Sequence, residues 1–281
     1  MKRRTIEIPL EYWPGKPNKV GKINISYKRR IDGQLVSRIH EFIRHNMKGP
    51  ARFGFENIVI GLSGGVDSTV AALLCHQALG KNKVTAVTVD LGFKEHAEQT
   101  KFAMGIARKL GINHKVIYAQ KLFDYYHSLM KERGPFTDID LITRIIHNIV
   151  FQVADSKKAV VISTLDKSED ILARHMEYFY GHFAPIADLY KTEVFDLSHF
   201  LGIPEDVIKR EPGCVEGQFD KIIFGVPYEV LDPILYLITE RKWSPKKIAQ
   251  RYRIDPVWLR KIEYRIRSHK WRMHTKNLLL S

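Results

Sequence analysis

The sequence predicts an α/β protein: a doubly wound parallel sheet with a short N-terminal arm and C-terminal helices. Apolar runs of strand length alternate with segments of helical periodicity, and one such run passes directly into a glycine-rich turn. Strands that alternate with helices need crossover connections, which cover both faces of a parallel sheet. The apolar runs are therefore predicted to be buried on both faces.

Each element is predicted from its apolar period and its flanking glycine and proline residues. Strands are expected at residues 57–61, 84–89, 114–118 and 159–162. Helices are expected from about 35 to 49 and at 68–79, 95–110, 141–155, 189–201, 245–252 and 256–268, with a surface loop at 213–224. Period-two stretches at 5–8 and 22–27 indicate a β-hairpin or an extended arm. We expect a basic extension at 1–34, the main domain at 35–240 and a basic helical segment at 241–281.

Composition restricts the class of protein. The chain has 281 residues, of which 44% are hydrophobic and 27% charged, as expected for a globular protein. No apolar run approaches the roughly 18 residues of a membrane span, so we expect a cytoplasmic protein that contacts no membrane. Cys75 and Cys214 are too few for a disulfide framework or a thiolate zinc site, and buried or loop thiols are expected.

The chain is strongly basic. It has 45 Lys and Arg against 31 Asp and Glu, a formal charge of +14. Such a charge attracts polyanions, including RNA and phosphorylated ligands. This balance indicates the kind of partner and identifies no site.

The turn after the first strand has the features of a phosphate site. A strand that turns sharply into a helix presents backbone N–H groups and the positive end of the helix dipole. Gly64 and Gly65 allow a phosphate to approach closely, and Ser63, Ser68 and Thr69 add hydroxyl groups. The loop lacks the lysine of the common nucleotide-binding loop and has a carboxylate at residue 67 instead, which suits a Mg²⁺ ion bridging phosphates.

Residues 63–68, SGGVDS, resemble the S-G-G-x-D-S pyrophosphate loop of the N-type ATP pyrophosphatases. That superfamily has a Rossmann-like fold of the adenine nucleotide alpha hydrolase type. The resemblance implies that ATP is bound there, AMP is transferred to an acceptor oxygen and pyrophosphate is released. A glycine-rich turn without a ligand is the simpler alternative, and the order of strand, motif and helix argues against it.

Three later segments resemble NAD synthetase. Residues 163–169, STLDKSE, are similar to its G-T-x-N-[KR]-S-E motif, and 185–194, PIADLYKTEV, to its P-[IL]-x-D-L-Y-K-T-x-V segment. Residues 217–218 and 225–235 resemble its ending. This resemblance implies a ligase that forms AMP and pyrophosphate and acts in NAD biosynthesis, in which ammonia converts an adenylated carboxylate to an amide. It also implies a homodimer.

The resemblance assigns candidate residues. It places Lys191 and Asp67 in catalysis, and Asp67 and Glu169 on Mg²⁺. The candidate ATP-binding residues are Gly61, Ser63, Gly64, Gly65, Val66, Asp67, Ser68, Thr69, Asp90, Arg144, Thr164 and Lys191. A solvated surface position for Lys191 and a helix-start role for Glu169 are the alternatives. A turn carboxylate is the alternative for Asp90, at the strand end where such a sheet would place adenine.

The chain departs from NAD synthetase where the acceptor would bind. Residues 170–184 are shorter than the family's segment and lack its aspartates, the P-[ST]-A-x-L loop is replaced at 212–215, and Ile146 stands where the family has a second arginine. The acceptor is therefore either deamido-NAD or another nucleotide-type group, such as a tRNA base. No segment resembles a glutaminase, so ammonia is expected free or from another chain. Decay into a non-catalytic binding protein is a third hypothesis, which the retained motifs oppose.

The first half and the tail bear on the same alternatives. Residues 89–93, VDLGF, resemble a stretch of GMP synthetase and of the tRNA-thiolating members more than that of NAD synthetase. The two helices around residues 254–256 could form a helix-turn-helix for nucleic acid. Amphipathic packing helices with solvated basic faces are the favoured alternative, because charge runs commonly solvate a face.

Overall fold

The computed structural model describes residues 13–272 except 130–131, 133–136, 173–180 and 211–219. The helices of the described residues are α1 (Gly33–Ala51), α2 (Val66–Leu79), α3 (Lys94–Leu110), α4 (Gln120–Leu129), α5 (Thr137–Ser156), α6 (Lys167–Leu172), α7 (Lys191–Phe200), α8 (Glu205–Ile208), α9 (Asp220–Phe224), α10 (Tyr228–Thr239), α11 (Pro245–Tyr252) and α12 (Pro256–Arg272), with a 3-10 turn at Lys81–Lys83. The strands are β1 (Asn57–Gly61), β2 (Val84–Asp90), β3 (Asn113–Tyr118) and β4 (Ala159–Ile162).

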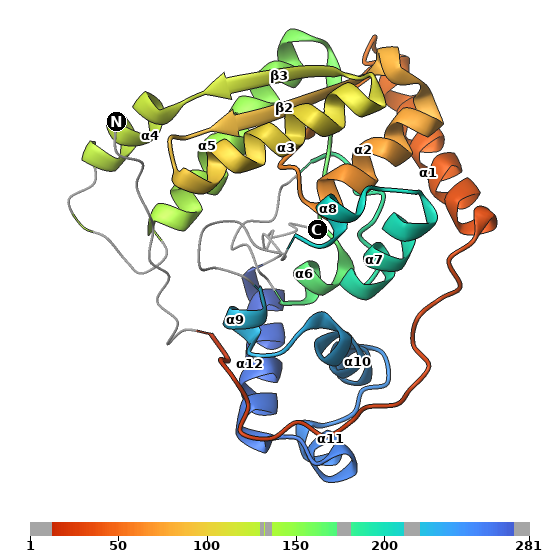
Figure 1. Ribbon diagram of the computed structural model, residues 1–281, viewed down its shortest axis with the longest axis vertical. Helices are drawn as coiled ribbons and strands as arrows, with labels where there is room; N and C mark the ends of the chain where they lie inside the picture. The colour runs from red at the N-terminus through yellow and green to blue at the C-terminus, as the bar shows by residue number, and fades with distance from the viewer. Residues whose placement is uncertain (1–12, 130–131, 133–136, 173–180, 211–219, 273–281) are drawn as a thin grey trace, which may run out of the picture.

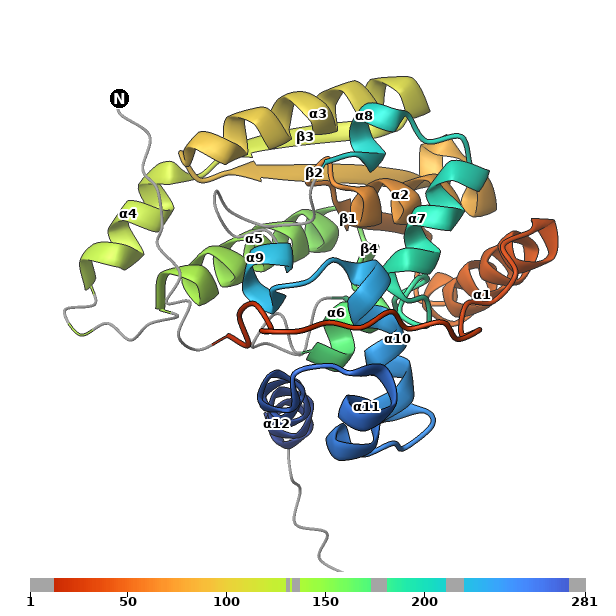
Figure 2. The ribbon, with the colours of Figure 1, turned by 60° about the horizontal axis from the view of Figure 1, so that its bottom comes forward.

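The four strands form one parallel sheet in the order β3-β2-β1-β4 (Figures 1 and 2; all four are labelled in Figure 2). Val59 of β1 pairs with Thr85 of β2 on one side and with Val161 of β4 on the other. All seven residues of β2 are buried, as expected for a strand with helices on both faces. The predicted α/β class and parallel sheet are confirmed.

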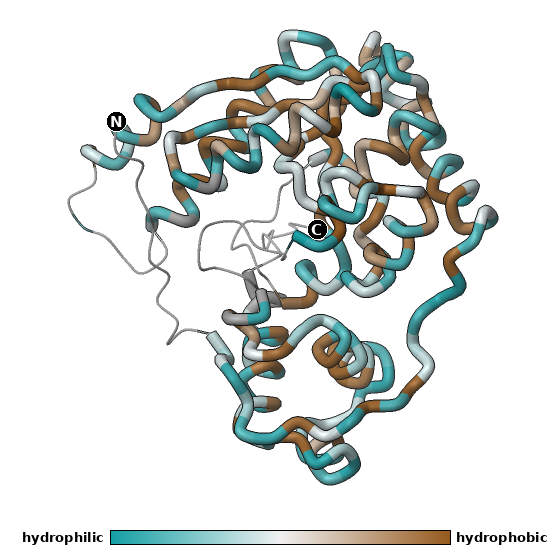
Figure 3. The backbone as a smooth tube through the Cα atoms, in the orientation of Figure 1, coloured by the Kyte–Doolittle hydropathy of each residue, from teal (hydrophilic) through white to brown (hydrophobic). Residues whose placement is uncertain are grey.

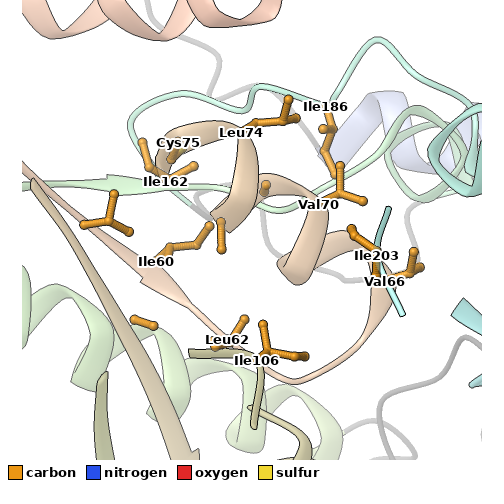
Figure 4. Packing of buried hydrophobic residues seen from close by; sticks show 14 of the residues in the cluster. Ile60, Leu62, Val66, Val70, Leu74, Cys75, Ile106, Ile162, Ile186 and Ile203 are labelled. Carbon is orange, nitrogen blue, oxygen red and sulfur yellow. The ribbon is translucent and has the colours of Figure 1, made fainter. Parts of the chain in front are cut away.

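Alternate side chains of the strands enter two different cores. Ile60 and Ile162 share one buried cluster with Val70, Leu74 and Cys75 of α2, and Figure 4 shows Cys75 beside Ile162. The intervening Val59, Val87 and Val161 pack on the opposite face, with α4 and α5. The two-residue period of a strand thus supplies both hydrophobic layers.

A third hydrophobic cluster lies beside the sheet domain. It combines α6, α9, α10, α11 and α12 with the N-terminal arm, and its centre contains Phe224, Ile234 and Trp258. In Figure 3, α10 is largely brown because it lies inside this cluster, whereas the outer α11 shows much more teal. The domain boundaries predicted at residues 34 and 240 stay predictions.

The arm alternative holds for the N-terminal segment, and the hairpin prediction is wrong in its described half. Residues 13–31 contain no strand. Ile23, Ile25 and Tyr27 instead pack against the third cluster. Their period of two places one side of an extended chain against helices, and a helical surface offers no backbone ladder to pair with. Residues 5–8 lie outside the described residues.

The helices α4 and α10 were not expected from the sequence, and the remaining differences are local. The expected loop at 213–224 ends in the short helix α9, whose Phe224 is fully buried, and 213–219 lie outside the described residues. Cys75 is a buried thiol in α2, as predicted, and burial raises its pKa to about 12. Cys214 falls outside the described residues. Within the described part of the chain, no helix is long and apolar enough to cross a membrane.

Candidate active site

The turn between β1 and α2 adopts a shape that requires glycine. Gly64 has φ +77°, in the left-handed region, and a Cβ there would lie 2.8 Å from the Cβ of Phe102 and 3.0 Å from the Ala103 backbone nitrogen. The turn therefore packs directly on α3. Gly65 is the N-cap of α2, and among the described residues no side chain caps this helix start. Its N–H groups and dipole face the end of the strand, as an anion site needs.

The hydroxyl groups divide between the site and the turn itself. The Ser63 and Ser68 hydroxyls lie 3.2 Å apart, and Ser68 donates to the Gly65 carbonyl at 3.1 Å. Thr69 donates to the same carbonyl at 2.8 Å, and the Val66 side chain is part of the core. Ser63 and Ser68 are thus the hydroxyls that reach the adjacent cavity, whereas Thr69 stabilises the turn.

A cavity of about 200 Å³ lies at the carboxyl ends of β1, β2 and β4. Of the residues predicted from the sequence, it is lined by Gly61, Ser63, Ser68, Thr164 and Glu169. The carboxyl edge of a parallel sheet is where such folds bind ligands.

Eight of the predicted ATP-binding residues do not line this cavity: Gly64, Gly65, Val66, Asp67, Thr69, Asp90, Arg144 and Lys191. Most of them form the β1–α2 turn, but Asp90 and Arg144 do not. Asp90 is buried at the end of β2, and its carboxylate accepts a hydrogen bond from the Gly92 N–H at 2.8 Å, which is the geometry of the turn alternative. Arg144 is exposed on α5. Its neighbours Ile146 and His147 line the cavity instead. Burial lowers the pKa of His147 to about 4, so the cavity wall carries a neutral imidazole at neutral pH.

The predicted catalytic residues meet at one point. The Lys191 ammonium is fully buried and lies 2.7 Å from an Asp67 oxygen, 2.6 Å from an Asp166 oxygen and 3.1 Å from a Glu169 oxygen. Asp67 comes from the start of α2, Glu169 from α6, and Lys191 is the first residue of α7. The surface-lysine alternative is therefore wrong for Lys191.

Asp166 is the residue that sequence reasoning missed in this cluster. It stands where the quoted motif has asparagine, which was the available signal. One oxygen accepts from the Glu169 N–H at 2.8 Å at the start of α6, and the other faces Lys191. Complete burial is the main cause that raises the pKa of Asp166, and the neighbouring carboxylates raise it further, while Lys191 opposes the shift.

Residues 35–275 match the family model for NAD synthase. The chain belongs to the NAD synthase family. It is 29% identical to the NH(3)-dependent NAD(+) synthetase of Pyrococcus furiosus over 87% of this chain and 95% of that one. It is 32% identical to the enzyme of the same name from Pyrococcus horikoshii over 85% and 92% of the two chains. The predicted family is thus confirmed, and the chain is an ATP-dependent amidating ligase of this family.

Solved structures agree on the fold. The NH3-dependent NAD synthetase of Campylobacter jejuni superposes with a TM-score of 0.72 at 22% identity, covering 88% of this chain and 98% of that chain. The NMN synthetase of Francisella tularensis gives the same TM-score at 19% identity, covering 88% and 97%. Both share the architecture with this NAD synthase family member.

A second set of missed residues holds the lysine turn in this family member. The Ser168 hydroxyl accepts from the Lys191 N–H at 2.9 Å and donates to Asp232 at 2.7 Å. The other Asp232 oxygen accepts from the Thr192 N–H at 2.8 Å. Asp232 lies on α10, in the segment that resembles the family ending. Burial raises its pKa to about 6, while its hydrogen bonds oppose the shift.

The raised pKa of Asp232 predicts that the free energy of unfolding depends on pH. A carboxyl whose pKa is raised from 3.8 to about 6 in the folded state binds more protons folded than unfolded between those values. Its contribution to the free energy of unfolding is therefore fully present below about pH 4 and is lost as the pH rises to about 6, by roughly 3 kcal/mol. Asp232→Asn removes this dependence. The variant should gain stability relative to wild type as the pH rises from 4 to 7, as measured by urea unfolding. A constant difference across this range would contradict the assignment.

Proposed function

We propose that the protein binds ATP with Mg²⁺ at the β1–α2 turn and adenylates the carboxylate of deamido-NAD. Ammonia then converts the adenylate to the amide of NAD, with release of AMP. The observation that carries this proposal is the Lys191 cluster, which joins the pyrophosphate loop to the two later motifs in one buried site. The relatives named NH(3)-dependent NAD(+) synthetase support the acceptor and the nitrogen source.

The residues of the chain divide the work on ATP. The N–H groups at the start of α2 and the Ser63 and Ser68 hydroxyls are suited to hold the departing pyrophosphate. Lys191 supplies a fixed cation where negative charge builds up on the phosphates. Because Lys191 is fully buried, water screens its charge little. The cavity at the strand ends is suited to the nucleoside part.

The acidic residues fit a divalent cation. Oxygen atoms of Asp67, Asp166 and Glu169 lie within 4.8 Å of one another. When ionised, these three carboxylates outweigh the single Lys191 charge and leave a formal −2 in a mostly buried place. Hard carboxylate oxygens are the ligands that Mg²⁺ prefers. Mg²⁺ bound there would neutralise charge on the phosphates; the sequence predicted two of its three carboxylates.

The decisive test offers the protein its alternative acceptors. Purified protein with ATP, Mg²⁺, deamido-NAD and ammonia should form NAD, AMP and pyrophosphate in equal amounts. Chromatography measures the nucleotides. Omission of ammonia should stop NAD formation. AMP production that requires tRNA and does not respond to deamido-NAD would overturn deamido-NAD as the acceptor. It would still support the adenylation step.

RNA as a partner is the second proposal for the basic tail, and it has less support. Basic residues are exposed on α11 and α12, including Lys246, Lys247, Arg260 and Lys261. Arg265, however, is used inside the protein. Its guanidinium lies 3.6 Å from the centre of the Trp13 ring, and its Nε donates to the Leu172 carbonyl at 2.8 Å. These contacts favour packing helices with a solvated basic face.

The homodimer is part of the same proposal, on the resemblance to the family. Its test is the molar mass in solution by light scattering. The cytoplasmic location stays a prediction from the sequence.

A further inference from the structure

The N-terminal arm is attached to the protein along most of its length. It starts in the third cluster and runs past α11 and α12 to α1 (Figures 1 and 2). The Gly15 N–H donates to the Ile223 carbonyl at 3.2 Å, and the Asp255 N–H donates to the Lys19 carbonyl at 2.9 Å. At its end, Asp32 caps α1. The arm therefore joins the C-terminal helices to the sheet domain.

Near its end, at residues 27–29, the arm contacts the first turn of α7. The Tyr27 hydroxyl lies 2.9 Å from the Thr192 hydroxyl. The backbone N–H of Arg29 donates to a Glu193 carboxylate oxygen at 2.7 Å, and its Nε donates to the same oxygen at 3.0 Å. The Arg29 guanidinium also donates to the Asp188 carboxylate and carbonyl, both at 2.8 Å. Thr192 and Glu193 directly follow the catalytic lysine, so the arm contacts the turn that carries it.

The contact between the arm and Glu193 bears on how α7 begins. The Glu193 side chain is fully buried, and its second oxygen accepts from the Tyr190 N–H at 2.8 Å, the N-cap of α7. Burying a carboxylate is costly unless a cation and hydrogen bonds compensate, and Arg29 supplies both. The N-cap of the helix that begins at Lys191 is thus held by a carboxylate that depends on the arm.

The lysine turn is fixed from two sides. Ser168 and Asp232 hold its N–H groups from α6 and α10, and the arm holds the Thr192 and Glu193 side chains. The arm contacts at residues 27–29 lie before residue 35, where the match to the family model begins. The family motifs alone therefore do not account for how this chain positions its lysine.

We propose that the N-terminal arm is a positioning element of the active site. Arg29 and Tyr27, acting through Glu193 and Thr192, fix the first turn of α7 so that Lys191 meets the phosphates of ATP. This inference rests on the proposed function. Arg29 and Tyr27 are positioning residues, since neither contacts the Lys191 ammonium in the structure.

The test uses Arg29→Met in the full chain, with Lys28→Met as the matched control. Lys28 is also on the arm and pairs with Asp196 on α7, but both side chains are partly exposed and neither contacts the lysine turn. Arg29→Met should lower kcat for pyrophosphate release about 10- to 100-fold, because a displaced catalytic group loses rate steeply. The KM for ATP should change less than about threefold, and Lys28→Met should match wild type.

The same substitution in a Lys191→Met background separates positioning from folding. If Arg29 acts through Lys191, it should lower the residual rate less than about twofold there. If Arg29→Met lowers the rate by the same factor in both backgrounds, and that factor matches the loss of folded protein, the inference is overturned. Tyr27→Phe removes only the hydroxyl, and it is the test variant to use if Arg29→Met does not fold. It should lower kcat about threefold or more, and an unchanged kcat would contradict the proposal.

The two proposals fail differently. A wild-type protein that releases no pyrophosphate with any acceptor would overturn the proposed function and this inference with it. An active wild type whose Arg29→Met and Tyr27→Phe variants keep full kcat would overturn the arm's role alone.

Discussion

Lys191→Met is expected to lower the rate of pyrophosphate release about 100- to 1,000-fold, because a fixed cation in a water-excluded site stabilises developing charge strongly. The ammonium is fully buried and within 3.1 Å of three carboxylates. The rate is measured by coupled pyrophosphate detection at saturating ATP and Mg²⁺.

The same variant should also lose stability when no divalent ion is present. Removing the ammonium leaves Asp67, Asp166 and Glu169 facing one another, and breaking a buried ion pair in this way costs about 3–5 kcal/mol. The pKa of Asp166 is already raised, and loss of Lys191 raises it further. Stability should therefore return as the pH falls and these carboxyls are protonated, and on addition of Mg²⁺.

A matched control is Lys83→Met. Lys83 makes an exposed ion pair with Glu56 at 2.7 Å, and the pair lies outside the site. Its activity and its response to Mg²⁺ should equal those of wild type. Full pyrophosphate release by Lys191→Met would remove this residue from the chemistry and leave it a purely structural charge.

Asp67→Asn is expected to lower pyrophosphate release about 100- to 1,000-fold and to leave the fold intact. Asp67 is the most exposed of the three carboxylates, with 20% of its side chain accessible. Replacing its charge is therefore expected to lower the free energy of unfolding only slightly. The variant lacks one charged oxygen donor for Mg²⁺ at the start of α2, and electrostatic losses of this kind have that size.

Titration with Mg²⁺ separates a weakened metal site from a disrupted turn. The half-saturating Mg²⁺ concentration should rise about tenfold or more in Asp67→Asn, as for other altered metal sites. Glu56→Gln, an exposed carboxylate outside the site, should leave it unchanged. An unaltered Mg²⁺ requirement together with full activity would exclude Asp67 from the metal site.

Much of the architecture was predictable because it depends on local patterns. β1, β2 and β4 are largely apolar at successive positions, and even the polar Thr85, Thr88 and Asp90 of β2 are buried. Strands of this kind are typical of a parallel sheet covered on both faces. The arm was ambiguous for a physical reason. Alternating residues such as Ile23 and Ile25 fit a strand, but they fit an extended chain on a helical surface equally well, and only the neighbouring helices decide between them.

The candidate site shows the same division. Gly64 and Asp67 were found from the residue types of the glycine-rich turn, whereas Glu169 and Lys191 followed from the resemblance of two later segments to the family's motifs. Asp90 was predicted from its place at a strand end as well as from resemblance, and Arg144 from resemblance alone, and neither residue lines the cavity. A residue's place in a motif does not specify where its side chain points.

By itself, the sequence determined the α/β class, the glycine-rich turn after the first strand and the ligase family, because these depend on short runs of residues and their order. The tertiary structure decided that Asp166 adds a third carboxylate, that Asp232 braces the lysine turn and that the arm holds Glu193. Such contacts join residues far apart in the chain, Arg29 and Glu193 being 164 positions apart. No local pattern encodes them, because they exist only when burial brings the two groups together and makes their pairing necessary.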